Sequence, residues 1–221
     1  MIFLIVGLLA YLIFLPLCFA ILFLVARKQC KNYSVFTFWL SNLGAEKSRS
    51  RLIFNICFFV FGLFNLLFSW ILFKILPLTL LTLAMLIFFS LSALIAVLVP
   101  FFPMDKRRKA HEIIASIIFL CILTACLLFT YFNLIAQIFP ALLTAFSLAV
   151  VVFSLLAIYS YLKLKEKYGG RAMGDLVFER KKEKSCILKN ATLWEWLAFS
   201  SVIVWLFAWT ICLLNFLLHG R

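Results

Sequence analysis

The fold is decided by the stretch from Ile113 to Leu162, which reads IIASIIFLCILTACLLFTYFNLIAQIFPALLTAFSLAVVVFSLLAIYSYL and contains no Asp, Glu, Lys or Arg. As one helix it would be about 75 Å long at 1.5 Å per residue, whereas the hydrocarbon core of a bilayer is only about 30 Å thick. The stretch must therefore fold back on itself. We expect two membrane-spanning helices here, separated by the polar residues Asn133 and Gln137, with Pro140 just beyond.

The composition of the whole chain agrees with a membrane location. Of its 221 residues, 67% are hydrophobic and 13% are charged, whereas ordinary soluble domains are about 45–50% apolar and about 25% charged. A soluble globular protein is therefore excluded. A helix needs about 20 apolar residues to cross a bilayer. This requirement predicts six spans in a single domain covering 1–221, at 2–26, 52–73, 78–102, 113–132, 134–162 and 192–218. The first span has no basic segment before it, so we interpret it as a retained helix rather than a signal peptide.

Lysine and arginine residues are distributed unevenly among the connections. Nineteen of them follow the first, third and fifth spans, and only Lys74 and Arg221 lie at the other ends. Because cytoplasmic loops of membrane proteins carry an excess of basic residues, this bias places loops one, three and five in the cytoplasm and both termini outside. The prediction is an all-α protein of the plasma membrane, with six transmembrane helices in one bundle.

The net charge of +13 and the seven cysteines have simple interpretations in such a protein. The basic residues adjoin apolar spans, which favours contact with anionic lipid head groups over binding of nucleic acid. Five cysteines lie within apolar runs, where a free thiol behaves as a small hydrophobic group, and no disulfide framework or zinc motif is predicted. Membrane lipids are the expected partners, and another membrane protein is an alternative one.

The interior of the predicted spans is uncharged. Every Lys, Arg, Asp and Glu falls in a loop or within a turn or two of a membrane surface. Proton-coupled pumps and voltage sensors need charged residues deep in their spans, so both are disfavoured. The polar residues that remain inside, such as Asn65, Thr124 and Ser147, most often hold helices together by hydrogen bonds.

Candidate functional residues gather at the predicted cytoplasmic surface. Loop one supplies a Ser-Asn-Leu-Gly-Ala stretch, loop three lies between a Phe-Pro-Met-Asp turn and a His-Glu pair, and one acidic residue lies near the start of the sixth span. The topology therefore allows five side chains to approach one another: Ser41, Asp105, His111, Glu112 and Glu195.

Each of these residues also has a structural interpretation. Asp105 and Glu112 fall around a helix start, where acidic side chains cap amides or offset the positive end of the helix dipole. His111 is expected to bond to Asp105 or to a carbonyl group. Trp194 and Trp196, on either side of Glu195, are expected to be interfacial anchors. The other histidine ends the sixth span on the opposite side, which excludes a zinc site with two or three histidines. No resident metal or cofactor is expected.

At these residues the chain resembles a family of small bacterial and archaeal membrane proteins, domain-of-unknown-function family 998. The matching features are the Ser-x-Leu-Gly-Ala stretch at 41–45, Asn55 and Gly62, the Phe-Pro-x-Asp turn at 102–105, and His111 with Ala115. Residues 96–99, Ala-Val-Leu-Val, stand where the family pattern leads us to expect glycines. The resemblance covers most of the chain and implies the same membrane fold and polar cluster, but it implies no activity.

Three functions are compatible with these observations. The leading hypothesis is a lipid- or protein-interacting membrane protein that has no conventional catalytic centre. The alternative is a membrane-embedded hydrolase or transferase acting on a lipid head group, with His111 as general base and Asp105 orienting it or sharing a metal with Glu112 or Glu195. A transporter of a small neutral solute is the third, since uncharged spans can line a pore.

Overall fold

The computed structural model describes residues 2–29, 40–46, 48–103, 106–168 and 186–219. Within these ranges the chain forms six long α-helices and two short 3₁₀ helices, η1 (Leu40–Gly44) and η2 (Val99–Phe101). The long helices are α1 (Ile2–Gln29), α2 (Arg51–Ile75), α3 (Leu80–Leu98), α4 (Arg108–Ala136), α5 (Ala141–Tyr168) and α7 (Cys186–His219).

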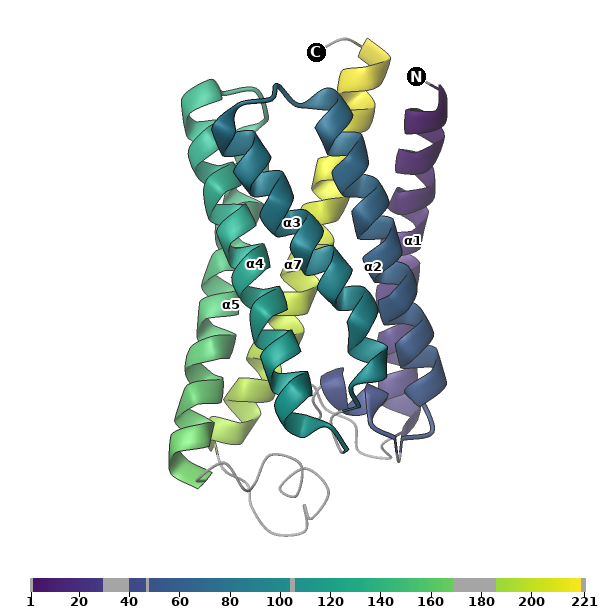
Figure 1. Cartoon of the computed structure of the whole chain (residues 1–221), viewed down its shortest axis with the longest axis vertical. Helices are drawn as coiled ribbons and strands as arrows, with labels where there is room; N and C mark the ends of the chain where they lie inside the picture. The colour runs from purple at the N-terminus through teal and green to yellow at the C-terminus, as the bar shows by residue number, and fades with distance from the viewer. Residues whose placement is uncertain (1, 30–39, 47, 104–105, 169–185, 220–221) are drawn as a thin grey trace.

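The long helices form a closed ring. From α1 to α5 each helix packs against the next one in the sequence, and α7 packs against both α5 and α1. Figure 1 shows the helices side by side, with both termini and the α2–α3 and α4–α5 turns at one end of the bundle. The carboxyl ends of α1, α3 and α5 and the amino ends of α2, α4 and α7 lie at the other end, which we call the basic end because Arg27, Lys28, Arg51 and Lys106 belong to it.

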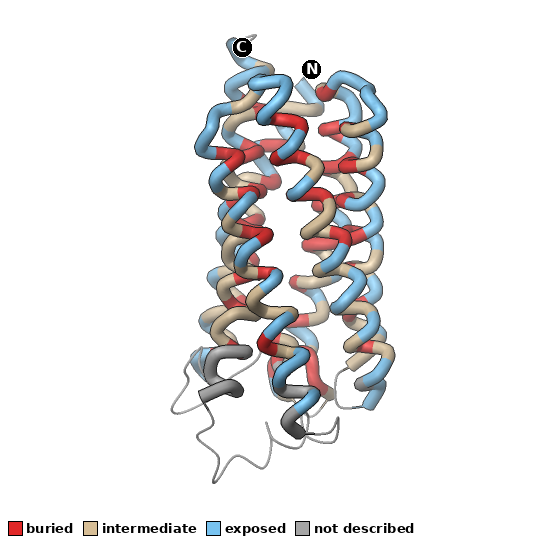
Figure 2. The backbone as a smooth tube through the Cα atoms, turned by 90° about the vertical axis from the view of Figure 1, so that its left-hand side faces the viewer, coloured by how far each residue is buried: buried red, intermediate tan, exposed pale blue. Residues whose placement is uncertain are grey.

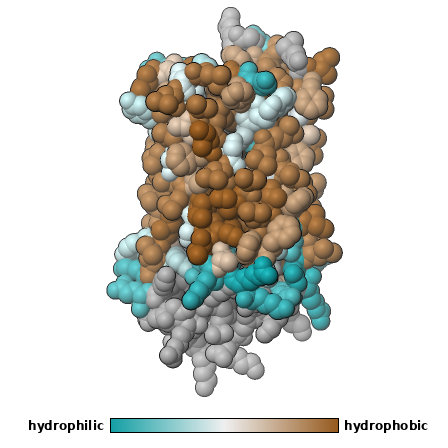
Figure 3. Space-filling view, viewed as in Figure 1, coloured by the Kyte–Doolittle hydropathy of each residue, from teal (hydrophilic) through white to brown (hydrophobic). Residues whose placement is uncertain are grey.

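All six long helices are long and apolar enough to cross a membrane. Figure 3 shows a hydrophobic belt around the middle of the bundle and hydrophilic residues gathered at the basic end. Buried residues recur along the helices between exposed ones (Figure 2), as expected where one side of each helix faces the bundle and the other faces lipid. The predictions of an all-α fold and of six membrane-spanning helices are confirmed.

Aromatic side chains on α7 fix this helix against α3 and α4. The ring of Trp205 lies 6.1 Å from that of Phe89 and 6.0 Å from that of Phe129, both in edge-to-face geometry. One turn further on, Trp209 lies 4.7 Å from Phe129 and 4.6 Å from Phe139. Lipid tails are as apolar as these rings, so close packing rather than exclusion of water holds helices together at this depth. α7 is thus part of the ring and of the core.

The turn between α4 and α5 lies later in the chain than the sequence predicted. The fourth span was expected to end at Phe132 and the fifth to begin at Leu134, but α4 continues through Asn133 and α5 begins only at Ala141. Other helix ends differ less: α1 extends beyond 26 to Gln29, and α7 begins six residues before 192. The predicted boundary at Asn133 is therefore wrong, whereas Gln137, the other polar residue expected there, ends α4.

Asn133 closes this turn from within α4. Its side-chain oxygen accepts a hydrogen bond from the Phe139 N–H at 2.9 Å, and its amide nitrogen donates to the Phe139 carbonyl at 3.1 Å. Gln137 adopts a left-handed conformation with φ of 48°, which commonly ends a helix. Pro140 has no N–H to continue the helical hydrogen bonds. The polar residue at 133 stabilises a turn that lies several residues beyond it.

Hydroxyl groups join the end of α4 to the beginning of α5. Thr130 Oγ1 donates to Ser147 Oγ at 3.1 Å, and Ser147 Oγ donates to the Cys126 carbonyl at 2.8 Å. Nearer the turn, Asn133 Nδ2 donates to Thr144 Oγ1 at 2.7 Å. Hydrogen bonds between transmembrane helices contribute about 0.6–2 kcal/mol each. The predicted role of neutral polar residues in joining helices is confirmed for this pair.

A close approach of backbones joins α2 to α3. A Cβ atom on Gly62 would lie 2.8 Å from the Val97 nitrogen and 2.9 Å from the Ala93 carbonyl oxygen. Real Cβ atoms do not approach backbone atoms so closely, and only glycine fits. The glycine that allows the contact thus lies on α2, opposite the residues of α3 where the family pattern led us to expect glycines.

Replacing Gly62 by Ala should lower the free energy of unfolding by about 1–3 kcal/mol, because the added methyl group forces α2 away from α3. Gly7→Ala is the matched control, since its Cβ would meet only the flexible Cδ1 atom of Ile71, at 3.3 Å. Thermal unfolding of both variants in detergent measures the difference. Equal melting temperatures for the two variants would contradict the close α2–α3 contact.

Candidate functional site

The segment before α2 folds back onto the basic end of the bundle. In η1, Leu40 and Leu43 are 4% and 0% exposed, and Ala45, just beyond it, is 1% exposed. Leu40 and Leu43 pack in a small core together with Phe54 of α2 and Trp196 of α7. The Ser-x-Leu-Gly-Ala stretch is therefore a packed part of the bundle rather than a solvated loop.

Gly44 and the serines that follow it fix the path into α2. A Cβ atom on Gly44 would lie 2.5 Å from the Phe54 ring, so the ring covers this residue directly. Ser50, immediately before α2, donates its hydroxyl to the Leu43 carbonyl at 2.9 Å and lies 2.7 Å from the Ser48 hydroxyl. These contacts make η1 and the start of α2 one unit.

The side chain of Glu195 joins this unit to α7. Its Oε2 atom accepts a hydrogen bond from the Leu40 N–H at 2.8 Å. Ser41 adds hydrogen bonds from its backbone N–H and its hydroxyl. The first N–H groups of a helix have no partner within it, and here a carboxyl group from a distant helix accepts from them. Two of the five candidate residues, Ser41 and Glu195, are thus in direct contact.

His111 is held by a different partner. It lies in the first turn of α4 with 7% of its surface exposed, and its Nδ1 atom is 2.8 Å from the Phe102 carbonyl oxygen. A carbonyl oxygen only accepts hydrogen bonds, so Nδ1 carries the hydrogen. The bond ties the start of α4 to the chain that leaves η2. A carbonyl group was one of the two partners predicted for this histidine, and that prediction is confirmed.

The remaining two candidates are Asp105 and Glu112. Asp105 lies outside the described residues, so its capping role and any metal shared with Glu112 or Glu195 stay predictions. Glu112 directly follows His111 in α4 and is half-buried. Among the described residues, no group of three or more His, Cys, Asp or Glu side chains is arranged to hold a metal ion.

Glu46 also belongs to the basic end, although it was not among the candidate residues predicted from the sequence. Its Oε2 atom lies 2.7 Å from the Lys106 ammonium, and its Oε1 atom lies 3.3 Å from the Arg51 guanidinium. It therefore connects loop one to loop three. The signal that could have identified it is its isolation, since it is the one acidic residue among the many basic residues between the first two spans.

Of the two tryptophans beside Glu195, Trp196 differs from the prediction. It is 3% exposed, and its ring lies edge-on to Phe19 and Phe23 of α1 at 6.5 and 6.3 Å. It packs inside the bundle and is not an interfacial anchor. Trp194 is half-buried and stacks on Phe153 of α5 at 6.2 Å.

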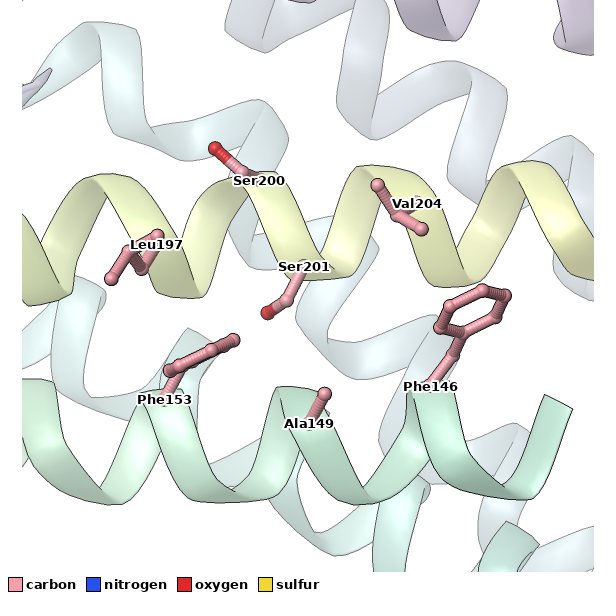
Figure 4. A pocket seen from close by; sticks show the side chains of 7 residues that line it. All are labelled: Phe146, Ala149, Phe153, Leu197, Ser200, Ser201 and Val204. Carbon is pink, nitrogen blue, oxygen red and sulfur yellow. The ribbon is translucent and has the colours of Figure 1, made fainter. Parts of the chain in front are cut away.

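A groove of about 300 Å³ lies between α5 and α7 (Figure 4). Its lining is apolar except for two serines: Phe146, Ala149, Phe153, Leu197, Ser200, Ser201 and Val204. Ser200 and Ser201 donate their hydroxyls to carbonyl groups of their own helix, at 2.7 and 2.8 Å. The groove therefore offers hydrocarbon contact and no acid–base group.

Comparison with known protein families identifies one that matches most of the chain. A family model described as Protein of unknown function (DUF998) matches residues 12–211. The chain belongs to this family. The match extends from α1 to α7 and includes Ser41, His111 and Glu195, so the resemblance predicted from the sequence is confirmed. No curated protein and no solved structure matches the chain.

Proposed function

We propose that this member of the DUF998 family binds anionic phospholipids of the plasma membrane through the basic end of its bundle, and that this end faces the cytoplasm. On this proposal the protein is a binding component of the membrane rather than an enzyme. The buried polar contacts at the same end, from Glu195 and His111, serve to hold the surface in shape.

The observation that carries the proposal is the charge left exposed at the basic end. The described side chains there include four acidic residues, Glu46, Glu112, Glu166 and Glu195. They also include eight basic residues, Arg27, Lys28, Arg49, Arg51, Lys106, Arg107, Lys109 and Lys163, and all but Arg51 are exposed. Glu46 and Glu195 already bond within the protein. An anionic membrane surface attracts each such basic residue by about 1 kcal/mol.

The position of these residues along the helices supports contact with head groups. Arg51 is the first residue of the span formed by α2, Lys109 the first of the span formed by α4, and Lys163 the last of the span formed by α5. The ends of membrane spans lie at the level of lipid phosphates. The opposite end of the bundle carries Lys74 alone among the described lysines and arginines, which gives the asymmetry expected when the basic end is cytoplasmic.

Phosphatidylglycerol should stabilise the purified protein more than phosphatidylcholine does. A ligand that binds only the folded state at 100 times its Kd adds about 2.7 kcal/mol, which raises the melting temperature of a chain this long by on the order of 5 °C. Thermal unfolding in detergent with each lipid, at low and high salt, measures the effect. The stabilisation should shrink as salt is added.

The matched variants for this experiment neutralise charge at the two ends of the bundle. Changing Arg27, Lys28, Arg107 and Lys109 together to Gln should remove most of the difference between the lipids. Lys74→Gln, at the other end, should leave it intact. Equal stabilisation by both lipids in the unaltered protein would contradict the proposal.

The proposed orientation predicts which end a membrane-impermeant thiol reagent reaches in intact cells. With the native cysteines replaced, Leu78→Cys in the exposed α2–α3 turn should react from outside, and Lys109→Cys should react only after permeabilisation. The reverse pattern would show that the basic end faces outward.

A further inference from the structure

Two cations from different parts of the chain converge on one carboxylate at the basic end. Glu46 receives the Lys106 ammonium at 2.7 Å and the Arg51 guanidinium at 3.3 Å. All three side chains are partly exposed: the exposed fraction is 69% for Lys106, 39% for Arg51 and 30% for Glu46. The arrangement is a two-cation site that already holds an anionic group.

The backbone on both sides of this site is fixed. Arg51 begins α2, directly after Ser50, whose hydroxyl bonds to the Leu43 carbonyl. The Lys106 N–H bonds to the Pro103 carbonyl at 3.3 Å, in the turn that leads into α4. The backbone at each cation is therefore held by a hydrogen bond, while the side chains of Arg51 and Lys106 are exposed enough to change partner.

The site lies at the depth expected for the phosphate groups of membrane lipids. Arg51 is the first residue of the candidate membrane span formed by α2, and Lys106 lies three residues before the span formed by α4, which begins at Lys109. A guanidinium can make two parallel hydrogen bonds to a phosphate, and an ammonium adds a third contact to the same group. The carboxylate of Glu46 presents the same kind of oxygen pair to these two cations.

The contacts of Glu46 are also of a kind that another anion can replace. Ion pairs with exposed partners contribute about 0–1 kcal/mol, because water and salt screen them and because ordering long side chains opposes them. A phosphodiester brings one negative charge and several acceptor oxygens to the same place. The exposed Arg107 and Lys109 beside the site make the surrounding surface positive for an incoming anion.

We propose that Arg51 and Lys106 form a phosphate subsite for the head group of an anionic phospholipid, and that Glu46 occupies this subsite until the lipid displaces it. This inference rests on the proposed function, to which it adds a defined location and an internal competitor. Glu46 then sets how strongly the basic end retains anionic lipid.

Native mass spectrometry of the full-length protein, equilibrated with equal amounts of dioleoyl phosphatidylglycerol and dioleoyl phosphatidylcholine, tests this. Glu46→Gln keeps the size of the side chain and removes the competing charge, so retained phosphatidylglycerol should rise about fivefold. Glu166→Gln is the matched control, because it makes the same change in net charge from an exposed position on α5. It should change retention much less.

Two further variants separate the local effect from general charge and from stability. Glu46→Asp keeps the charge but shortens the reach to Arg51 and Lys106, so it should give a smaller gain in the same direction. Adding Arg51→Gln and Lys106→Gln to Glu46→Gln should abolish the gain. Loss of phosphatidylglycerol retention in both Glu46 variants, whether or not their melting temperatures fall, would show that Glu46 supports the site rather than competes for it, and would overturn the inference.

The remaining outcomes distinguish this inference from the proposed function. If the unaltered protein retains phosphatidylglycerol above phosphatidylcholine but Glu46→Gln and Glu166→Gln behave alike, the proposed function stands and the subsite is wrong. If the unaltered protein retains both lipids equally, the proposed function itself fails. Millimolar glycerol 1-phosphate should not displace the lipid; displacement would assign the site to free phosphate compounds instead.

Discussion

The hydrogen bonds between Glu195 and the first residues of η1 join α7 to a segment 155 residues earlier in the chain. The path of loop one at the basic end follows from this connection. With Leu40 held at α7, Leu43 enters the small core beside Phe54, and Glu46 comes within reach of Arg51 and Lys106. A buried carboxyl group without partners would destabilise the bundle, so the N–H groups of η1 and the acceptor on α7 stabilise each other.

The bilayer imposes the second constraint. Every helix must satisfy its own backbone in hydrocarbon, and lipid competes equally well for apolar side chains, so specific packing decides which helices meet. The structure meets this demand differently at each contact: Gly62 admits the backbone of α3, hydroxyls join α4 to α5, and Trp205 and Trp209 bring α7 against α3 and α4. The resulting bundle is apolar along its length and presents its charge at the ends, as a protein that meets lipid head groups requires.

Much of this architecture could be predicted from the sequence, because the thickness of the bilayer determines the length of the apolar spans and lysine and arginine residues collect at their ends. The predictions that were wrong concern residues whose role depends on partners that only the folded structure brings together. Asn133 was taken as a helix boundary because it is polar, but its side chain caps a turn at Phe139. Trp196 was assigned to the interface because it is a tryptophan near the start of the sixth span, but its ring packs against α1.

The candidate site, too, could be predicted only in part. Ser41 and Glu195 could be assigned to one surface from topology alone, yet their bond needs the fold of η1, which no local pattern specifies. Glu46 was overlooked because a lone acidic residue in a basic loop usually faces solvent, and its two partners lie on separate segments. For Asn65 the predicted role in joining helices is confirmed, because the hydroxyl of Tyr11 on α1 donates a hydrogen bond to its side-chain oxygen at 2.8 Å. That Tyr11 is the partner could not be predicted.

Hydrogen–deuterium exchange in the Glu195→Ala variant tests the central claim most directly. Leaving the N–H groups of η1 without their acceptor costs about 1–3 kcal/mol, so amides of residues 40–46 should exchange at least about fivefold faster than in the unaltered protein. Amides in the middle of α2 should keep their protection, and Glu166→Ala should leave both regions unchanged. Unaltered exchange of residues 40–46 in Glu195→Ala would contradict the claim that this carboxyl group holds loop one against the bundle.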